Sequence, residues 1–240
     1  MTQGAELPRK HLFDMPEGLI YLDGNSLGML PKAVGVRVAE TIDREWGQSL
    51  IRAWNAEGWM DLPTQLGDRL GAMFLNAPAG SVSVGDTLSI KVYQALTAAL
   101  KMRPDRRVIL SDSNNFPSDL YMAQGLIETL GQGYRLETVP ADDIETALTD
   151  EVAVVLLTEV DYRTGRRLDS AKITRAVHDV GAVMIWDLAH SLGAVPVDMA
   201  VNPAEFAVGC TYKYLNAGPG APAFIYIRPD LPDDVQPALA

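Results

Sequence analysis

Two uninterrupted apolar runs are the clearest pattern along the chain. They span residues 152–157 and 182–186, and polar residues follow each of them at once. A strand without polar alternation is typical of a parallel sheet in which both faces are covered. Shorter apolar runs predict further strands at 81–84, 107–110, 135–139, 206–210 and 224–227.

Between these runs, apolar residues recur at the spacing of an α-helix. This spacing predicts helices at about 32–46, 63–75, 118–130, 141–148 and 169–180, and one that opens in the 85–89 loop and runs to about 102. Strands that alternate with helices form a parallel or mostly parallel α/β sheet, expected here as three α/β/α layers. Ligands of such sheets bind beyond the carboxyl ends of the strands, so the polar residues there are the candidate site.

Composition narrows the class of partner. The 240 residues are 48% hydrophobic, which suffices for one large core, and the formal net charge of −11 disfavours a nucleic acid or an anionic membrane. The single cysteine, Cys210, excludes an internal disulfide and fits a reducing compartment. Because no run is long enough to span a membrane and the N-terminus has no signal-peptide pattern, we expect a cytoplasmic protein.

The strongest chemical candidate is Lys213, which lies between two tyrosines after an apolar run and before a Gly/Pro turn. Most lysines are solvated surface residues, but a buried lysine is the type of amine that forms Schiff bases. Asp187 follows another apolar run, where a carboxylate needs a cationic partner. That partner could be a protonated pyridine nitrogen or Lys213 itself, and Asp187 could also be a simple cap or turn residue.

Pyridoxal 5′-phosphate accounts for this set better than other cofactors. Lys213 would hold it as an imine, and Asp187 would keep its ring nitrogen protonated. The small-residue loop 85–89 enters a helix and would present N–H groups to the phosphate, while Phe116 offers a face for the ring. The chain has no G-x-G-x-x-G motif, no Walker lysine and no histidine or cysteine spacing typical of metal ligands, so no metal is expected.

Four segments closely resemble the kynureninase family, whose members are pyridoxal-phosphate enzymes of the aspartate-aminotransferase fold. They are residues 21–28, 115–119, 186–193 and 211–218, and residues 46–55 resemble the bacterial branch. The resemblance runs from about residue 20 to the end of the chain. It implies the large domain of a fold-type-I enzyme, incomplete here, over residues 51–240, with residues 1–50 belonging to the small domain and the C-terminal domain absent.

The resemblance also implies residue roles. Lys213 would be the imine lysine, and Asp187 would pair with the pyridine nitrogen, with Asp119 and His190 close by. The remaining contacts would be Phe116 stacked on the ring, Leu88, Ser89 and Tyr212 at the phosphate, Thr158 near the phenolic oxygen, and Trp54 and Asn55 at the aryl group of the substrate. Lys213 would act as the base, and Tyr212 is the candidate for later proton delivery.

The reaction implied by the resemblance is hydrolysis of L-kynurenine, or its 3-hydroxy form, to anthranilate (or 3-hydroxyanthranilate) and L-alanine, in a homodimer. Members of the family are longer than 240 residues, and their later part carries the arginine that binds the substrate carboxylate. Which of the two substrates is preferred stays open.

Other functions remain possible from the sequence. The first is another fold-type-I enzyme, such as an aminotransferase or a cysteine desulfurase. A desulfurase needs a mobile cysteine, whereas Cys210 is three residues from Lys213 and expected to be buried. The second is an inactive remnant that serves as a binding or dimerisation module. A nucleotide-binding Rossmann module is disfavoured by the absent glycine motif.

Overall fold

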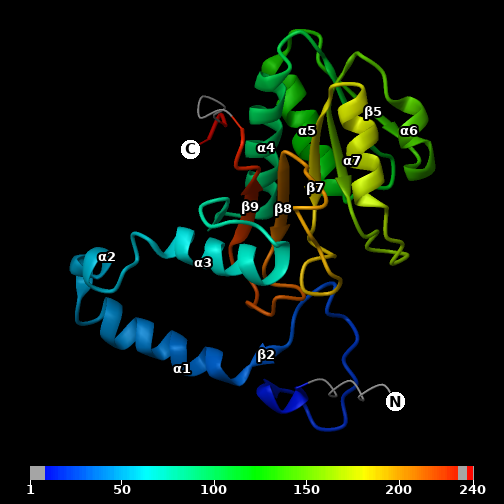
Figure 1. Ribbon diagram of the computed structural model, residues 1–240. Coiled ribbons are helices and arrows are strands. Elements are labelled where there is room, and N and C mark those ends of the chain that lie inside the picture. Colours follow the sequence, from blue (N-terminus) through cyan, green and yellow to red (C-terminus); the bar gives the residue numbers. More distant parts are fainter. Residues whose placement is uncertain (1–8, 232–236, 240) are drawn as a thin grey trace.

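The structure is a computed structural model of the 240-residue chain, and it describes residues 9–231 and 237–239. Figure 1 shows a sheet flanked by helices, from which the first part of the chain extends as an arm.

A seven-stranded sheet forms the centre, in the order β3-β9-β8-β7-β6-β4-β5. The strands are β3 Val82–Gly85, β4 Val108–Asp112, β5 Arg135–Val139, β6 Val152–Thr158, β7 Val183–Asp187, β8 Phe206–Cys210 and β9 Ala223–Ile227. The pairs β5–β4, β4–β6, β6–β7 and β7–β8 are parallel, whereas β9 is antiparallel to both β8 and β3. The predicted mostly parallel sheet is confirmed.

Helices cover both faces of the sheet, as predicted. Alternate residues of β7 point to opposite sides: Val183 and Ile185 join the core under α4 (Leu88–Met102) and α5 (Pro117–Leu130), while Met184 and Trp186 join the core under α7 (Ser170–Asp179). Both cores are continuous and apolar, which explains why β6 and β7 read as unbroken hydrophobic runs. The core under α7 also includes side chains of α3 (Leu62–Leu70), η4 (Gly71–Leu75) and α6 (Ile144–Ala147). The short helix η5 (Ala141–Asp143) directly precedes α6.

A buried acid ties β7 to β8 at the edge of the sheet opposite to the polar strand ends. Glu205 accepts hydrogen bonds from Met184 N (2.9 Å) and Arg228 Nη1 (2.7 Å), and its carboxylate lies 3.1 Å from His178 Nε2. Burial by itself would raise the pKa of Glu205, but the contacts with His178 and Met184 N outweigh it and hold this pKa below its usual range. The two strands that lead into the candidate site are thus fixed to each other.

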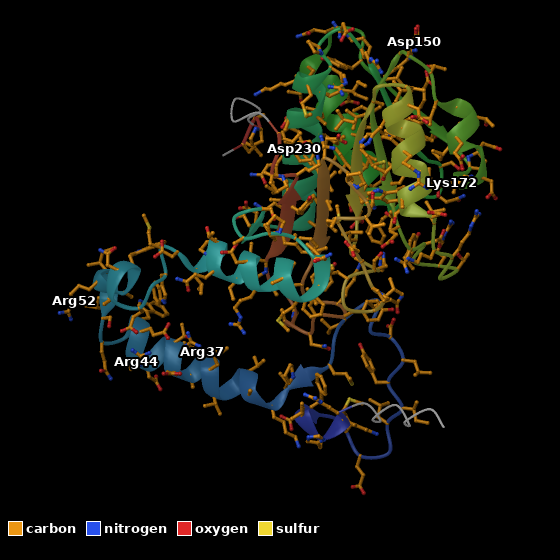
Figure 2. The ribbon with its side chains drawn as sticks, in the orientation of Figure 1. Arg37, Arg44, Arg52, Asp150, Lys172 and Asp230 are labelled. Atoms are coloured by element: carbon orange, nitrogen blue, oxygen red, sulfur yellow. The ribbon has the colours of Figure 1, made fainter. Side chains whose placement is uncertain are left out.

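The N-terminal arm leaves many large apolar side chains uncovered. It contains η1 (Lys10–Leu12), the two-stranded pair β1 (Phe13–Asp14) and β2 (Leu30–Pro31), α1 (Lys32–Glu40), η2 (Thr41–Trp46), η3 (Leu50–Arg52) and α2 (Ala53–Ala56). Figure 2 shows Arg37, Arg44 and Arg52 along it, and Glu45 links it internally through Arg37 (2.7 Å) and the Trp59 indole N–H (2.9 Å). Exposed apolar side chains of the arm include Val36, Val38, Ile42, Trp46, Leu50, Ile51 and Trp54.

Candidate functional site

The lysine turn, residues 211–217, follows directly from β8. Asn216 N donates to Lys213 O (2.9 Å) and Ala217 N donates to Thr211 O (3.1 Å), so that the chain folds back tightly. Asn216 adopts a left-handed conformation with φ of 57°, which asparagine tolerates better than most residues. This turn directs Lys213 into the protein, where the residue is only 6% exposed.

His190 is the polar partner of the lysine. Its Nε2 lies 2.7 Å from Lys213 Nζ, and the lysine forms no ion pair with Asp187 in the described part of the chain. Burial, reinforced by the charge of Lys213, lowers the pKa of His190 to about 4, so the imidazole is neutral near pH 7. A neutral imidazole can accept a hydrogen bond from Lys213 Nζ at Nε2. Its Nδ1 is buried and has no hydrogen-bond partner among the described residues.

Two acids lie next to this pair. Asp187, at the end of β7, is 1% exposed and accepts a hydrogen bond from Ala189 N (2.8 Å), while Thr158 Oγ1 at the end of β6 lies 3.4 Å from its Oδ2. The Thr158 hydroxyl also donates to Asn115 Oδ1. Asp119, in the first turn of α5, is fully buried. The charges of Asp187 and Lys213 both act on Asp119, so these residues from separate elements lie near one another in the structure.

Aromatic rings form one side of the site. The ring centroid of Phe116 lies 5.4 Å from Lys213 Nζ and 5.0 Å from the ring of Tyr162, which itself stacks on His190 at 6.0 Å. Sequence reasoning missed Tyr162. Its position a few residues beyond the β6 run, in the segment Asp161-Tyr162-Arg163-Thr164-Gly165, is the signal that could have identified it.

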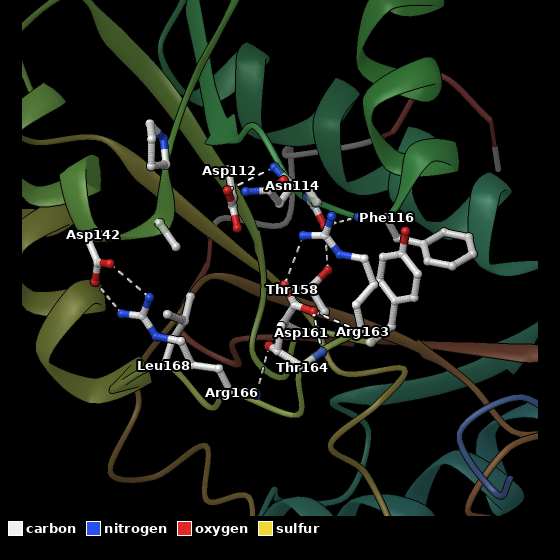
Figure 3. Close-up of a pocket in the computed structure, with 14 residues that line it drawn as sticks. Asp112, Asn114, Phe116, Asp142, Thr158, Asp161, Arg163, Thr164, Arg166 and Leu168 are labelled. Carbon is white, nitrogen blue, oxygen red and sulfur yellow. Dashed lines mark hydrogen bonds and ion pairs between the residues drawn. The ribbon is translucent and has the colours of Figure 1, made fainter.

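Beside these rings opens a cavity of about 230 Å³. Figure 3 shows Phe116, Thr158, Asp161 and Arg163 around it, with ion pairs that join Arg163 to Asp161 and Arg166 to Asp142. Because both arginines already face carboxylates, this cavity does not present a free cationic patch.

The start of α4 is the candidate anion site. Thr87 caps the helix through its side chain, which accepts a hydrogen bond from Ile90 N, and Leu88 and Ser89 form the first turn. N–H groups of a first turn have no acceptor within the helix, and the helix dipole favours a negative ligand there. Lys91 Nζ holds the side chain of Asp86 at 3.1 Å and so fixes the loop before the helix.

Tyr212 adds a hydroxyl to the same edge of the sheet. Burial, together with the nearby Cys210, raises the pKa of Tyr212 to about 12. The phenol is therefore protonated near neutral pH and can donate a hydrogen bond.

Trp54 and Asn55 lie elsewhere. Both are exposed on α2, where Trp54 packs edge to face on Trp59 with centroids 6.2 Å apart. Figure 1 shows α2 at the far end of the arm, well away from the end of β8. Within one chain the structure does not bring these two residues to Lys213, and their role in substrate binding remains a prediction.

A loop near the N-terminus supports the lysine turn from outside. Gly28 N donates to Tyr212 O (2.8 Å), and a β-carbon added at Gly28 would lie 2.2 Å from Lys213 O and 2.7 Å from Asn216 Cα. Only glycine permits this approach of two backbones. The motif at 21–28 resembles the kynureninase family, but nothing in its sequence indicates contact with the lysine.

The site as a whole has the chemistry to receive a flat, charged carbonyl compound. It offers a buried amine, a carboxylate, an aromatic face and helix N–H groups, and it contains buried polar atoms without a partner, namely both carboxyl oxygens of Asp119 and Nδ1 of His190. In the described residues no group of three or more histidine, cysteine or acidic side chains could hold a metal ion. In the same residues no helix is long and apolar enough to cross a membrane.

Fold and site together define an α/β protein with a buried lysine at the carboxyl edge of its sheet. The Aminotransferase class-V family model matches residues 92–240. The chain belongs to the class-V aminotransferase family.

Curated relatives are similar over nearly all of this chain. A kynureninase of Pseudomonas fluorescens is 48% identical over 244 residues, which cover 100% of this chain and 58% of the relative. A kynureninase of Deinococcus radiodurans is 53% identical over 220 residues, which cover 90% of this chain and 53% of the relative. The chain therefore spans a little over half the length of these relatives.

Solved structures share the fold. A C-DES mutant with glycine covalently linked to its PLP cofactor has a TM-score of 0.78 at 19% identity, covering 93% of this chain and 60% of that one. An apo cysteine desulfurase of Thermococcus onnurineus NA1 has a TM-score of 0.74 at 19% identity, covering 92% and 56%. At this level of identity the likeness concerns the fold alone.

Proposed function

We propose that this chain forms the catalytic part of a kynureninase, which hydrolyses L-kynurenine or its 3-hydroxy form to anthranilate or 3-hydroxyanthranilate and L-alanine. The observation that carries the proposal is the buried Lys213, in contact with a neutral histidine and close to Asp187, in a chain about half identical to curated kynureninases. A cytoplasmic location is part of the proposal, and the single unpaired Cys210 supports it.

The residues present fit pyridoxal 5′-phosphate as cofactor. Lys213 would be the amine for its aldehyde, Asp187 would be the carboxylate for its ring nitrogen, and Phe116 would offer a ring face. Leu88, Ser89 and Tyr212 would serve the phosphate, with Thr158, Asp119 and His190 around the ring. When bound, the cofactor supplies an electron sink that stabilises negative charge on the substrate carbon next to the amine.

The protein's own groups move the protons. Once free, the Lys213 amine can take the proton from that carbon at Nζ, and the neutral His190 beside it accepts a hydrogen bond from the resulting ammonium. Tyr212 keeps its proton on Oη near neutral pH and can deliver it to the product carbon later in the reaction. Asp187 is held ready by Ala189 N and does not need to reorient.

A cysteine desulfurase is less well supported, although one shares the fold. Cys210 is only 4% exposed, and burial raises the pKa of its thiol. A buried, protonated thiol is a poor nucleophile.

Kynurenine cleavage is tested directly on the purified chain. With pyridoxal 5′-phosphate and L-kynurenine added, we expect fluorescent anthranilate and an equal amount of L-alanine, measured by chromatography. The Lys213→Arg variant is the control, because it keeps the positive charge but lacks the reactive amine. A keto-acid product without anthranilate would point instead to an aminotransferase.

We further propose that the exposed arm packs against a second copy of the chain, forming a homodimer. Its uncovered side chains, such as Ile51 (77% exposed) and Trp46 (63% exposed), are more extensive than a soluble monomer normally presents. Trp54 and Asn55 lie on this arm and could reach the partner's site.

Ile51→Glu tests the arm as the dimer interface. A charge in an apolar interface should raise the dimer dissociation constant about tenfold or more, as measured by sedimentation velocity. Val201→Glu is the matched control, because Val201 is similarly exposed (65%) but lies outside the arm. Equal dissociation constants for the two variants would exclude the arm as the interface.

A further inference from the structure

The connection between β6 and α7 forms a hairpin, residues 159–168, at the carboxyl edge of the sheet. An antiparallel bridge joins Val160 to Arg167, and Asp161 N donates to Arg166 O at 2.9 Å. At the tip, which Figure 3 shows, Asp161 Oδ1 accepts hydrogen bonds from two backbone N–H groups at 2.7 and 2.9 Å. The hairpin is thus closed by its own hydrogen bonds, and its position on the protein depends on contacts at its base and its tip.

A buried ion pair fixes the base of this hairpin. Glu159 is 1% exposed, and its Oε1 accepts hydrogen bonds from Arg167 Nη2 (2.9 Å), Arg167 Nε (3.1 Å) and Ser170 Oγ (3.2 Å). Arg167 Nη2 also donates to Pro196 O (2.7 Å), and Glu159 N donates to Asp187 O (3.1 Å). The Glu159–Arg167 pair therefore joins the hairpin to α7, to the end of β7 and to the loop that follows β7. Because a buried carboxylate is costly without a cationic partner, this pair resists separation.

Tyr162 lies at the tip of the hairpin and packs on the ring of His190. The two rings are stacked, with centroids 6.0 Å apart and planes 29° apart. Tyr162 also meets Phe116 edge to face at 5.0 Å, whereas Phe116 itself is tilted against His190 at 6.1 Å. Tyr162 is therefore the neighbour that lies nearly parallel to the imidazole.

This stacking matters because the imidazole of His190 is held at one nitrogen only. A histidine that acts through one ring nitrogen commonly has the other fixed by a hydrogen bond. His190 Nε2 lies 2.7 Å from Lys213 Nζ, but Nδ1 is buried and has no hydrogen-bond partner among the described residues. The orientation of the ring toward Lys213 therefore depends on the side chains packed against it.

We infer that Tyr162 is a positioning residue, which holds the His190 imidazole against Lys213. The Glu159–Arg167 pair in turn keeps the hairpin, and with it Tyr162, in place. The positioning of the imidazole is independent of the proposed function, and only its effect on turnover rests on that function.

The titration of His190 in the chain without cofactor tests this positioning. Burial and the charge of Lys213 lower the pKa of His190 to about 4, and the charge of Asp161 opposes them. Tyr162→Leu removes the stacked ring, so water reaches the imidazole and its pKa moves toward the usual value of about 6.5. In NMR spectra of the histidine rings between pH 8 and pH 5.5, the wild-type His190 signal should not titrate. In Tyr162→Leu its midpoint should rise by about one to two pH units, so that titration begins in this range.

Tyr162→Phe is the matched control. Phenylalanine keeps the stacked ring and loses only the hydroxyl, so His190 should titrate as in wild type. The signal is identified by its absence from the spectrum of His190→Gln. A His190 signal in Tyr162→Leu that also fails to titrate would overturn the inference, and so would equal midpoints in Tyr162→Leu and Tyr162→Phe.

Two arginine variants of the same hairpin test its base. Arg167→Gln removes the cation that faces Glu159, so the hairpin should shift and the His190 midpoint should rise by a similar amount. Arg166→Gln is the control, because it breaks only an exposed ion pair with Asp142, and such pairs contribute little. A folded Arg167→Gln protein in which His190 titrates as in wild type would exclude the pair from this role. If Arg167→Gln does not fold, the double variant with Glu159→Gln, which leaves no buried charge, takes its place.

Turnover is a second readout, and it rests on the proposed function. His190 holds the lysine that is the proposed base, so Tyr162→Leu should lower kcat for kynurenine cleavage about tenfold or more and change KM by a few-fold at most. Tyr162→Phe should recover most of this loss, and an equal loss in both variants would refute the role of the stacked ring. If wild type itself releases no anthranilate, the proposed function fails, and the histidine titration still decides the inference.

Discussion

Lys213→Ala is expected to abolish the borohydride-sensitive absorbance band of a lysine-bound cofactor and to lower kynurenine cleavage on the order of 10³-fold or more. The lysine is buried against His190 and Phe116, and no other amine takes part in these contacts. Without it the chain loses both the covalent attachment and the base. The measurement is an absorbance spectrum with added pyridoxal 5′-phosphate, before and after borohydride, together with the rate of anthranilate release.

Two further variants serve as controls. One tests whether the positive charge alone is sufficient, and the other tests whether any exposed lysine-to-alanine change has the same effect. Lys213→Arg keeps a cation beside His190 but should also lack the band, whereas Lys172→Ala, an exposed change on α7 (Figure 2), should behave as wild type. Survival of the band in Lys213→Ala would assign the covalent attachment to another residue and refute our placement of the site.

The second large effect is expected from Gly28→Ala, far from Lys213 in the sequence. The new methyl group would lie 2.2 Å from the lysine carbonyl oxygen, and backbone atoms on both sides cannot rotate away as a side chain could. The lysine turn must shift, and a displacement of about 1 Å in a catalytic group costs on the order of 10²-fold in activity. We expect a comparable loss of cofactor affinity, measured by titration of the absorbance band.

Gly35→Ala is the matched control. Gly35 lies on α1, nothing lies within 4 Å of an added β-carbon, and alanine in a helix should stabilise the chain by about 0.5–1 kcal/mol. Cofactor affinity in Gly35→Ala should equal that of wild type. If Gly28→Ala also binds as wild type, the loop at 23–28 does not hold the lysine turn in place.

Much of the fold can be predicted from the sequence, because a strand that is buried on both faces is a continuous run of apolar residues. The runs at 152–157 and 182–186 became β6 and β7 within a residue or two, since every side chain in them meets a core. The helix predicted at 63–75 is α3 continued by η4. By contrast, β3 and β5 carry weaker patterns, because one of their edges or faces meets solvent.

The site was less visible in the sequence. Lys213 and Asp187 stand at the ends of apolar runs, and a sheet with parallel strands brings such ends together. Tyr162 follows its strand only after a turn, so its contact with Phe116 depends on how that turn folds. The lack of donors around Asp119 is a property of its neighbours in space, which no local pattern records.

The contact between Gly28 and the lysine turn also bears on how the chain folds. It joins a loop near the N-terminus to a turn that follows six of the seven strands of the sheet, so most of the chain lies between the two partners. Contacts of such long sequence separation form late, because closing so large a loop is entropically costly until other structure has shortened it. During synthesis the contact between the N-terminal loop and the lysine turn can form only after almost the entire sheet has been synthesised. Competence to capture a cofactor therefore arises as one of the last events of folding.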